Sequence, residues 1–343
     1  MSGPGENGWR AGRRAGRHGR RAADVVLALA LAAGPGRGCG QGADPAAGQV
    51  VCRMPEPAEI PAPPAVAYRR CPLASKVGEF QVELAQHFTA VSGSIAEAPL
   101  PTDVREVVVE SGPCRLLRRR VLDCDPACTA GMTCAEAGRC VRYPGNLDAG
   151  TVGVTGLRCQ VQMHPDPVSQ RYWDTNLPHP GYEPGASIGL HASGAAVPPF
   201  SLAGWGVAPL VLDQALLRLE PGQPVPIAWT PGQAGPARIQ LDLVINQHGI
   251  TPATLSCEVP DSGRFEVPVD LIERLLAAGT SGYPQLRVSR QTSDSADLPP
   301  GCVEFVVSSA VERSLDVAGH TPCRSDVDCP TPKRCQVVSQ SCL

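Results

Sequence analysis

The chain has 343 residues, of which 43% are hydrophobic and 18% charged, so it can bury a core and is not disordered throughout. Its formal net charge is −3, and residues 1–38 hold seven arginines against Glu6 and Asp24, which leaves −8 on the remainder. This mild acidity excludes an electrostatic footprint for nucleic acid or anionic lipid. The 36 glycines and 36 prolines favour many short strands joined by turns.

Residues 1–38 have the parts of a secretory signal peptide. An arginine-rich stretch ends at Arg20 and Arg21, an apolar run fills residues 25–33, and Gly34, Pro35 and Gly36 follow. The apolar run is far shorter than the about 20 residues that span a bilayer. The sequence therefore predicts export, against the alternative of a disordered basic tail before a buried helix.

The sequence is compatible with two alternative cleavage sites of the signal peptide. The sequence Ala30-Leu31-Ala32 suits ordinary cleavage, whereas Gly38 before Cys39 resembles the end of a bacterial lipoprotein signal. The chain has 15 cysteines, and an odd number leaves one unpaired in an oxidising compartment. If Cys39 carries a lipid, the other 14 can form seven bridges, so the count favours lipidation of Cys39.

Two cysteine clusters share a similar spacing. They are Cys124, Cys128, Cys134 and Cys140, and Cys323, Cys329, Cys335 and Cys342. Four-cysteine zinc sites usually contain close C-x2-C pairs, and the sequence has none. In an exported chain the clusters predict disulfides that hold small modules at residues 121–145 and 319–343, and no metal site.

Between the signal peptide and the first module lie two further segments. Residues 39–70 are rich in Pro, Gly and Ala, which is the composition of an extended linker. Residues 71–120 are predicted to form a small β region with strands near 79–84 and 104–110. Cys71 and Cys114 bracket this region and are candidates to close it with a bridge.

Residues 146–318 are predicted to form an antiparallel β-sandwich. Ile239, Leu241, Leu243 and Ile245 alternate with polar residues, which is typical of a strand with one buried face. Turn signals separate several such runs. Further strands are expected at 150–157, 187–192, 226–230, 253–259, 264–267, 285–292 and 302–308.

Other features of this unit follow from single residues. One helix is expected at 269–278, because apolar residues recur there at helical spacing between Pro268 and Gly279. Cys257 and Cys302 each lie in a predicted strand and are expected to bridge the sandwich. Trp205 and Trp229 are predicted to be core or rim aromatics.

Several segments of the chain resemble known proteins. They include Gly112-Pro-Cys114, Cys124-Asp-Pro-Ala-Cys128, Met132-Thr-Cys134, Cys140-Val-Arg-Tyr-Pro144, Cys257-Glu-Val-Pro-Asp-Ser-Gly263 and the ending from Cys323 to Pro330. Their order over about residues 75–343 is similar to that of cysteine-rich surface lipoproteins of myxobacteria-like bacteria. The biochemical role of that family is unknown, so the resemblance implies an envelope location and a β fold, and implies no activity.

Two short patterns in the sequence point to other functions. Gly185, Ser187 and Gly189 satisfy G-x-S-x-G, but a nucleophile elbow needs a strand before the serine and a helix after it, and the flanks of Ser187 predict a turn and then a strand. His248 and His320 are the histidines that could serve such a serine as a base. Asp326 and Asp328 could ligate calcium, but a solvated acidic turn held by disulfides is favoured.

The sequence therefore predicts a mainly β chain, with an antiparallel sandwich flanked by disulfide-rich modules. The predicted function is that of an exported, lipid-anchored, non-enzymatic cell-envelope or surface protein with a binding or structural role. The alternatives are a secreted serine hydrolase using Ser187 and a calcium-dependent adhesion module. No cofactor is predicted. Expected partners are an envelope or surface protein or a glycan, with membrane contact through the lipid only and no nucleic acid.

Overall fold

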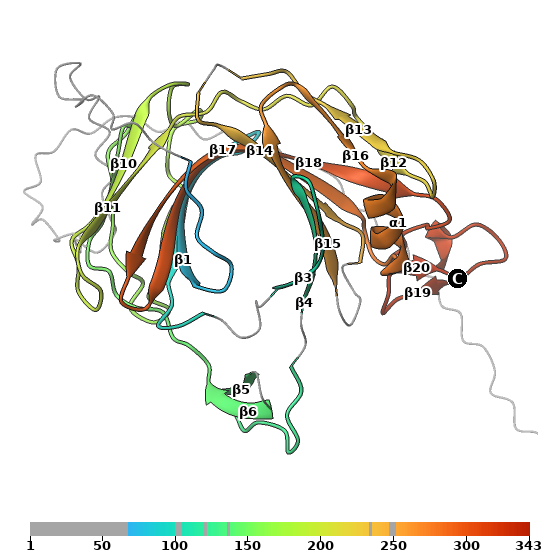
Figure 1. The fold of residues 1–343 in the computed structure, drawn as a ribbon, viewed down its shortest axis with the longest axis horizontal. Coiled ribbons are helices and arrows are strands. Elements are labelled where there is room, and N and C mark those ends of the chain that lie inside the picture. The colour runs from blue at the N-terminus through green and yellow to red at the C-terminus, as the bar shows by residue number, and fades with distance from the viewer. Residues whose placement is uncertain (1–67, 100–104, 120–121, 136–137, 233–234, 247–251) are drawn as a thin grey trace, which may run out of the picture. The chain divides into compact units, whose positions relative to one another are not determined.

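The computed structural model describes residues 68–99, 105–119, 122–135, 138–232, 235–246 and 252–343 (Figure 1). The described residues are mainly β, and ten strands form one large sheet. These strands are β1 (Lys76–Leu84), β2 (Thr89–Ile95), β3 (Arg105–Ser111), β4 (Cys114–Arg119), β9 (Tyr172–Asp174), β12 (Leu217–Leu219), β14 (Arg238–Val244), β15 (Ala253–Pro260), β17 (Gln285–Leu298) and β18 (Gly301–Val317).

The remaining elements form smaller units. A four-stranded sheet contains β7 (Val152–Thr155), β8 (Val161–Met163), β10 (Ser187–Ala192) and β11 (Phe200–Trp205). Two-stranded sheets pair β13 (Val225–Ala228) with β16 (Arg264–Val267), β5 (Met132–Ala135) with β6 (Arg139–Arg142), and β19 (Cys335–Gln336) with β20 (Ser341–Cys342). The helices are α1 (Val269–Ala277) and the short 3-10 turn at Asp326–Asp328.

The hairpin of β17 and β18 is the spine of the large sheet. The two strands pair from Gln285 opposite Ser314 to Leu298 opposite Gly301. From one edge to the other, the strands run in the order β3-β4-β15-β14-β17-β18-β1-β2-β9, with β12 also paired to β18. The pairs β1–β18 and β12–β18 are parallel and the other pairs are antiparallel, so the sheet is mixed.

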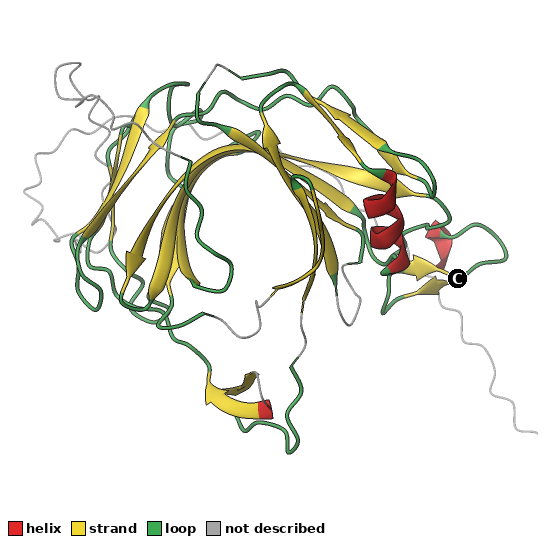
Figure 2. Ribbon diagram, viewed as in Figure 1, coloured by secondary structure: helices red, strands yellow, loops and turns green. Residues whose placement is uncertain are grey.

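Two hydrophobic cores lie on the same side of this spine. Val303, Phe305 and Val307 of β18 belong to one core, which is completed by the four-stranded sheet. Leu286 of β17 and Leu315 of β18 belong to the other, with β13, β16 and α1. Side chains two apart in a strand share a face, so both cores pack on one face of the large sheet. This is the outer, convex face of the curved sheet (Figures 1 and 2).

Buried polar residues of β17 join the two cores. Arg290 is 2% exposed, and its Nε lies 2.7 Å from a carboxylate oxygen of Asp261. The same guanidinium donates to the carbonyls of Ala208, Pro209 and Thr230. The indole N–H of Trp229, which is also buried, donates to Asp261 over 2.7 Å. The buried charge is thus fully hydrogen-bonded, and it fixes the connection between the two cores to the spine.

Most of the predicted elements of 146–318 are confirmed. Strands β10 and β16 have the predicted bounds, and α1 ends one residue before the predicted end. Helix α1 begins after Pro268, whose fixed φ suits a helix start, and Gly279 follows its C-cap at φ +90°. The long strands β17 and β18 extend well past the predicted ranges, because their middle residues are polar and break the apolar alternation.

Residues 71–120, expected as a small β region, contribute β1 to β4 to the large sheet. Strand β1 lies parallel to β18, and β4 lies antiparallel to β15. Both pairings join segments more than 100 residues apart in the sequence. The periodicity of a single strand reports its buried face, but it does not report its neighbour in the sheet.

The predicted bridge between Cys257 and Cys302 is wrong. Cys302 is bonded to Cys71, and Cys257 to Cys114, with Cα–Cα distances of 5.6 and 4.0 Å. The predicted closure of residues 71–120 by Cys71 and Cys114 is wrong for the same reason. Strands β15 and β18 are separated by β14 and β17, so even residues directly opposite each other are about 14 Å apart at about 4.8 Å per strand. Cys257 is moreover level with Val311, far along β18 from Cys302. A disulfide requires Cα atoms closer than about 7 Å.

The two cysteine clusters have the same connectivity. In each, the first cysteine is bonded to the third and the second to the fourth, as Cys124–Cys134, Cys128–Cys140, Cys323–Cys335 and Cys329–Cys342. Each cluster holds a two-stranded sheet, β5–β6 or β19–β20. The predicted disulfides of these modules are confirmed, and each disulfide joins two cysteines of the same module.

We expect Asp261→Ala to lower the free energy of unfolding by about 3–5 kcal/mol, because it leaves the buried Arg290 guanidinium without its counter-charge. Urea unfolding followed by fluorescence measures the change. The control is Glu110→Ala, which removes the exposed ion pair with Arg115 and should cost less than about 1 kcal/mol. Similar losses for both variants would contradict a special role for the buried pair.

Candidate functional site

The structure places Ser187 at the start of β10, after a turn at Pro184 and Gly185. The predicted context of turn and then strand is confirmed, and it differs from the strand and helix of a nucleophile elbow. Among the described residues, no histidine is hydrogen-bonded to Ser187. His320 contacts the carbonyl of Gly282 through Nε2 at 2.9 Å, and His248 lies outside the described residues. The surroundings of Ser187 therefore lend no support to a hydrolase.

The carboxylates of Asp326 and Asp328 are hydrogen-bonded within the C-terminal module. Asp328 accepts hydrogen bonds from the backbone N–H groups of Arg324 and Ser325, and Asp326 accepts one from that of Cys335. The bonds from Arg324 and Ser325 lower the pKa of Asp328. Each carboxylate thus shapes a turn, as expected for an acidic turn held by disulfides.

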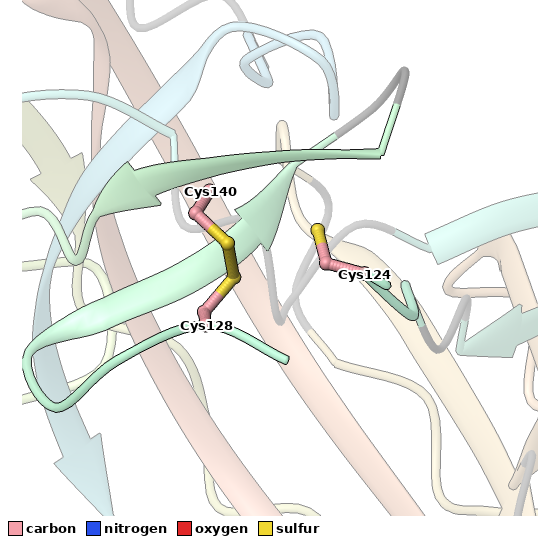
Figure 3. A group of neighbouring side chains, drawn as sticks. All are labelled: Cys124, Cys128 and Cys140. Atoms are coloured by element: carbon pink, nitrogen blue, oxygen red, sulfur yellow. A yellow bond between two sulfur atoms is a disulfide. The ribbon is translucent and has the colours of Figure 1, made fainter. Parts of the chain in front are cut away.

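The cysteine clusters bring sulfur atoms close together because they are bonded. Cys124, Cys128 and Cys140 have sulfur atoms within 4.8 Å of one another, and Figure 3 shows the bond between Cys128 and Cys140. Cys124 is bonded to Cys134. Cys159 is also in a disulfide, so all 13 cysteines of the described ranges are oxidised. The predicted lipidation site Cys39 lies outside the described residues.

The face of the large sheet that points away from the two cores is polar. We call it the polar face, and it is the concave side of the sheet in Figure 1. Strand alternation and the register of the pairs assign its side chains. They include Gln81, Glu83, Ser92, Gln240, Asp242, Ser256, Glu258, Arg287, Ser289, Gln291, Glu304, Ser308 and Glu312.

Hydrogen bonds link these side chains across neighbouring strands. Gln81 of β1 donates to Ser308 of β18 over 3.0 Å. On the other side of the spine, the amide of Gln240 in β14 donates to Ser256 of β15, and Ser256 donates to Asp242, both over 2.6 Å. The polar face is therefore an ordered array of hydroxyl, amide and carboxylate groups.

Residues 68–71, which we call the strap, lie on the polar face. The hydroxyl of Tyr68 donates to Glu258 of β15 over 2.8 Å and accepts from Gln291 of β17 over 3.1 Å. Burial raises the pKa of Tyr68 to about 12, so the hydroxyl is protonated at neutral pH. The disulfide of Cys71 with Cys302 attaches the end of the strap to β18.

Glu304 of β18 lies beneath the strap and is 1% exposed. Its carboxylate accepts hydrogen bonds from Arg70 at 3.0 Å, from Lys76 at 2.6 Å and from the backbone N–H of Cys71 at 2.5 Å. Burial opposes ionisation of Glu304, but the charges of Arg70 and Lys76 outweigh it, and the pKa stays below the usual range. The end of the strap is thus held by a disulfide and a buried ionic cluster, in addition to the hydrogen bonds of Tyr68.

The part of the polar face over β9, β2 and β1, which we call the open end, is partly exposed to solvent, whereas Ser289, Gln291 and Ser308 in the middle of the face are buried. Trp173 of β9 is 55% exposed and lies opposite Ser92 of β2, which in turn lies opposite Gln81. Glu83 follows Gln81 on the same face of β1, and its carboxylate contacts the guanidinium of Arg287 at 2.8 Å. Arg287 also contacts Glu312 at 3.4 Å. The open end thus combines one exposed indole with polar groups and with an arginine that is already paired with carboxylates.

Sequence reasoning did not find the polar face. The serines and glutamines of β17 carry no motif, and only the register with β14 and β18 places them beside Gln240 and Ser308. The sequence did contain one indication of the ionic cluster, which is the position of Glu304. Glu304 lies between the apolar residues Val303 and Phe305. A glutamate that is buried in such a strand needs cationic partners.

No family model matches the chain, and no curated protein sequence matches it. Among solved structures, the FN1-FN3 domains of chicken CNTN1 share 10% identity over 68% of this chain and 70% of theirs, with a TM-score of 0.16. A 1.5-MDa bacterial ice-binding adhesin shares 11% identity over 71% of this chain and 66% of that one, with a TM-score of 0.15. TM-scores this low carry no argument about fold or function.

We expect the stability of the protein to depend on the ionisation of Glu304. The pKa of folded Glu304 lies below the unfolded value of about 4.3, so its contribution is complete above that pH and is lost as the pH falls through the folded pKa. Glu304→Gln should be less stable at pH 7, and the difference from wild type should shrink below about pH 4. Unfolding free energies measured from pH 3 to 7 decide this, and a difference independent of pH would contradict it.

Proposed function

We propose that this chain is an exported cell-envelope or surface protein with a binding or structural role. The observation that carries the proposal is the oxidation of every described cysteine, in long-range bridges as well as in the modules. Such disulfides persist in secreted and envelope compartments and are rare in the cytosol. The Arg-rich and apolar segments of residues 1–38 supply the means of export.

Attachment through a lipid on Cys39 is part of the proposal. Among the described residues, no helix is both long enough and apolar enough to cross a bilayer. A lipid at Cys39 would place the Pro-rich residues 40–67 between the membrane and the strap. The similarity to surface lipoproteins of myxobacteria-like bacteria supports this part of the proposal, and it stays a prediction.

The binding role is assigned to the polar face. A large sheet that is packed on its convex side and polar on its concave side offers an extended surface on a rigid support. The disulfides of Cys71 and Cys114 hold that sheet together across segments far apart in the sequence. The two modules with internal disulfides would serve as compact spacers or caps.

Intact mass of the native protein, before and after reduction, tests the proposal. We expect a mature chain that starts at Cys39 and carries acyl mass, with 14 of the 15 cysteines alkylated only after reduction. Peptide mapping should recover Cys71 with Cys302 and Cys114 with Cys257. An uncleaved chain with thiols that react without reduction would overturn export. Cleavage without acyl mass would overturn the anchor alone.

A further inference from the structure

We propose that the open end of the polar face binds an uncharged polysaccharide segment, with Trp173 stacking on a sugar ring and Gln81, Glu83, Ser92 and Arg287 bonding to hydroxyl groups. This deepens the proposed binding role and rests on the assignment of that role to the polar face. Trp173, Ser92 and Gln81 are direct cross-strand neighbours from β9 through β2 to β1. The juxtaposition of an exposed indole with this polar row carries the inference.

The charges of the polar face argue for a neutral ligand. Arg287 is shared between Glu83 and Glu312, and Lys76 bonds to both Glu79 and Glu304. At the far edge, Arg115 pairs with Glu110. Because each of these cations is already paired with one or two carboxylates, a polyanion would find no free cation among them and would have to displace existing ion pairs.

The polar groups of the face suit hydroxyl groups. Amide and carboxylate groups are planar and can each bond to two neighbouring hydroxyls, and a serine both donates and accepts. The side chains of the open end are held by their neighbours, as Gln81 is by Ser308 and Arg287 by Glu83. A ligand therefore meets donors and acceptors that are already oriented, which reduces the entropy lost on binding.

Trp173 supplies the apolar part of the site. Its indole is 55% exposed on an edge strand, whereas Tyr172 beside it points into the core and is 1% exposed. Sugar rings have apolar faces of C–H groups and a rim of hydroxyls, so they match an aromatic surface beside polar groups. A stable protein partner would instead need a contiguous apolar centre, and the apolar residues Val306 and Ala310 of this face are buried.

The shape of the surface favours a chain over a small molecule. Small ligands are usually enclosed in a pocket that buries most of their surface. A hollow of about 290 Å³ between β3, β4, β15 and α1 lies at the other edge of the sheet, away from Trp173, and is lined by Val108, Leu116 and Arg274. The open end is a row of side chains along several strands, so a ligand has to be extended to contact all of it.

The experiment uses the full mature chain, purified with its disulfides intact, in native gels that contain dextran, hydroxyethylcellulose, galactomannan or alginate. We expect at least one neutral polymer to retard the protein. Trp173→Ala should weaken that association at least tenfold, and Gln81→Ala severalfold. The matched control is Trp205→Ala, which removes a half-buried indole from β11 of the other sheet and should change the association less than twofold. Thermal unfolding of each variant checks its fold.

Three outcomes would overturn the inference. They are no retardation by any neutral polymer, retardation by alginate alone that salt abolishes, and retardation by a neutral polymer that Trp173→Ala leaves unchanged. The assay needs no knowledge of the compartment, so its failure is separate from a failure of the mass and thiol measurement. If the thiols were free but retardation still depended on Trp173, the proposed binding face would stand and the proposed envelope location would be contradicted.

Discussion

The fold depends on one constraint, which is that a single long hairpin of β17 and β18 supports two hydrophobic cores at once. Between those cores the spine cannot be apolar, because a connecting segment crosses there and its backbone groups need partners. Arg290 solves this by bonding to three carbonyls and to Asp261, and Asp261 in turn binds the indole of Trp229. A buried charge held in this way adds little net stability, but its geometry specifies how the two halves join.

In the proposed function, the two faces of the same sheet divide packing from binding. Its convex side is used for packing, and its concave side presents polar groups that neighbouring strands orient. Glu304 belongs to both roles, since it is buried in the spine and its carboxylate holds Arg70 of the strap. The bridge of Cys71 with Cys302 secures that strap without depending on a hydrophobic contact. A surface held in this way suits the proposed role, in which a binding face has to stay intact outside the cytosol.

The resemblance of the two cysteine modules suggests a common design. Both have first-to-third and second-to-fourth pairing, and both enclose a two-stranded sheet. Units this small cannot bury a core of their own, so cross-links replace one. The carboxylates of Asp326 and Asp328 complete the second module by binding backbone N–H groups, which explains why acidic residues lie between its cysteines.

The sequence by itself determined the local properties. Alternation of apolar residues located β14, β15 and the start of β17, Pro268 and Gly279 delimited α1, and the cysteine spacing indicated disulfide modules. Only the tertiary structure decided which strands are neighbours. That choice placed β1 beside β18 and β4 beside β15, changed the partners of Cys257 and Cys302, and gathered Gln81, Ser308 and Trp173 on one face. The physical reason is that periodicity reports which side of a strand is buried, whereas pairing between segments more than 100 residues apart depends on how the whole sheet packs.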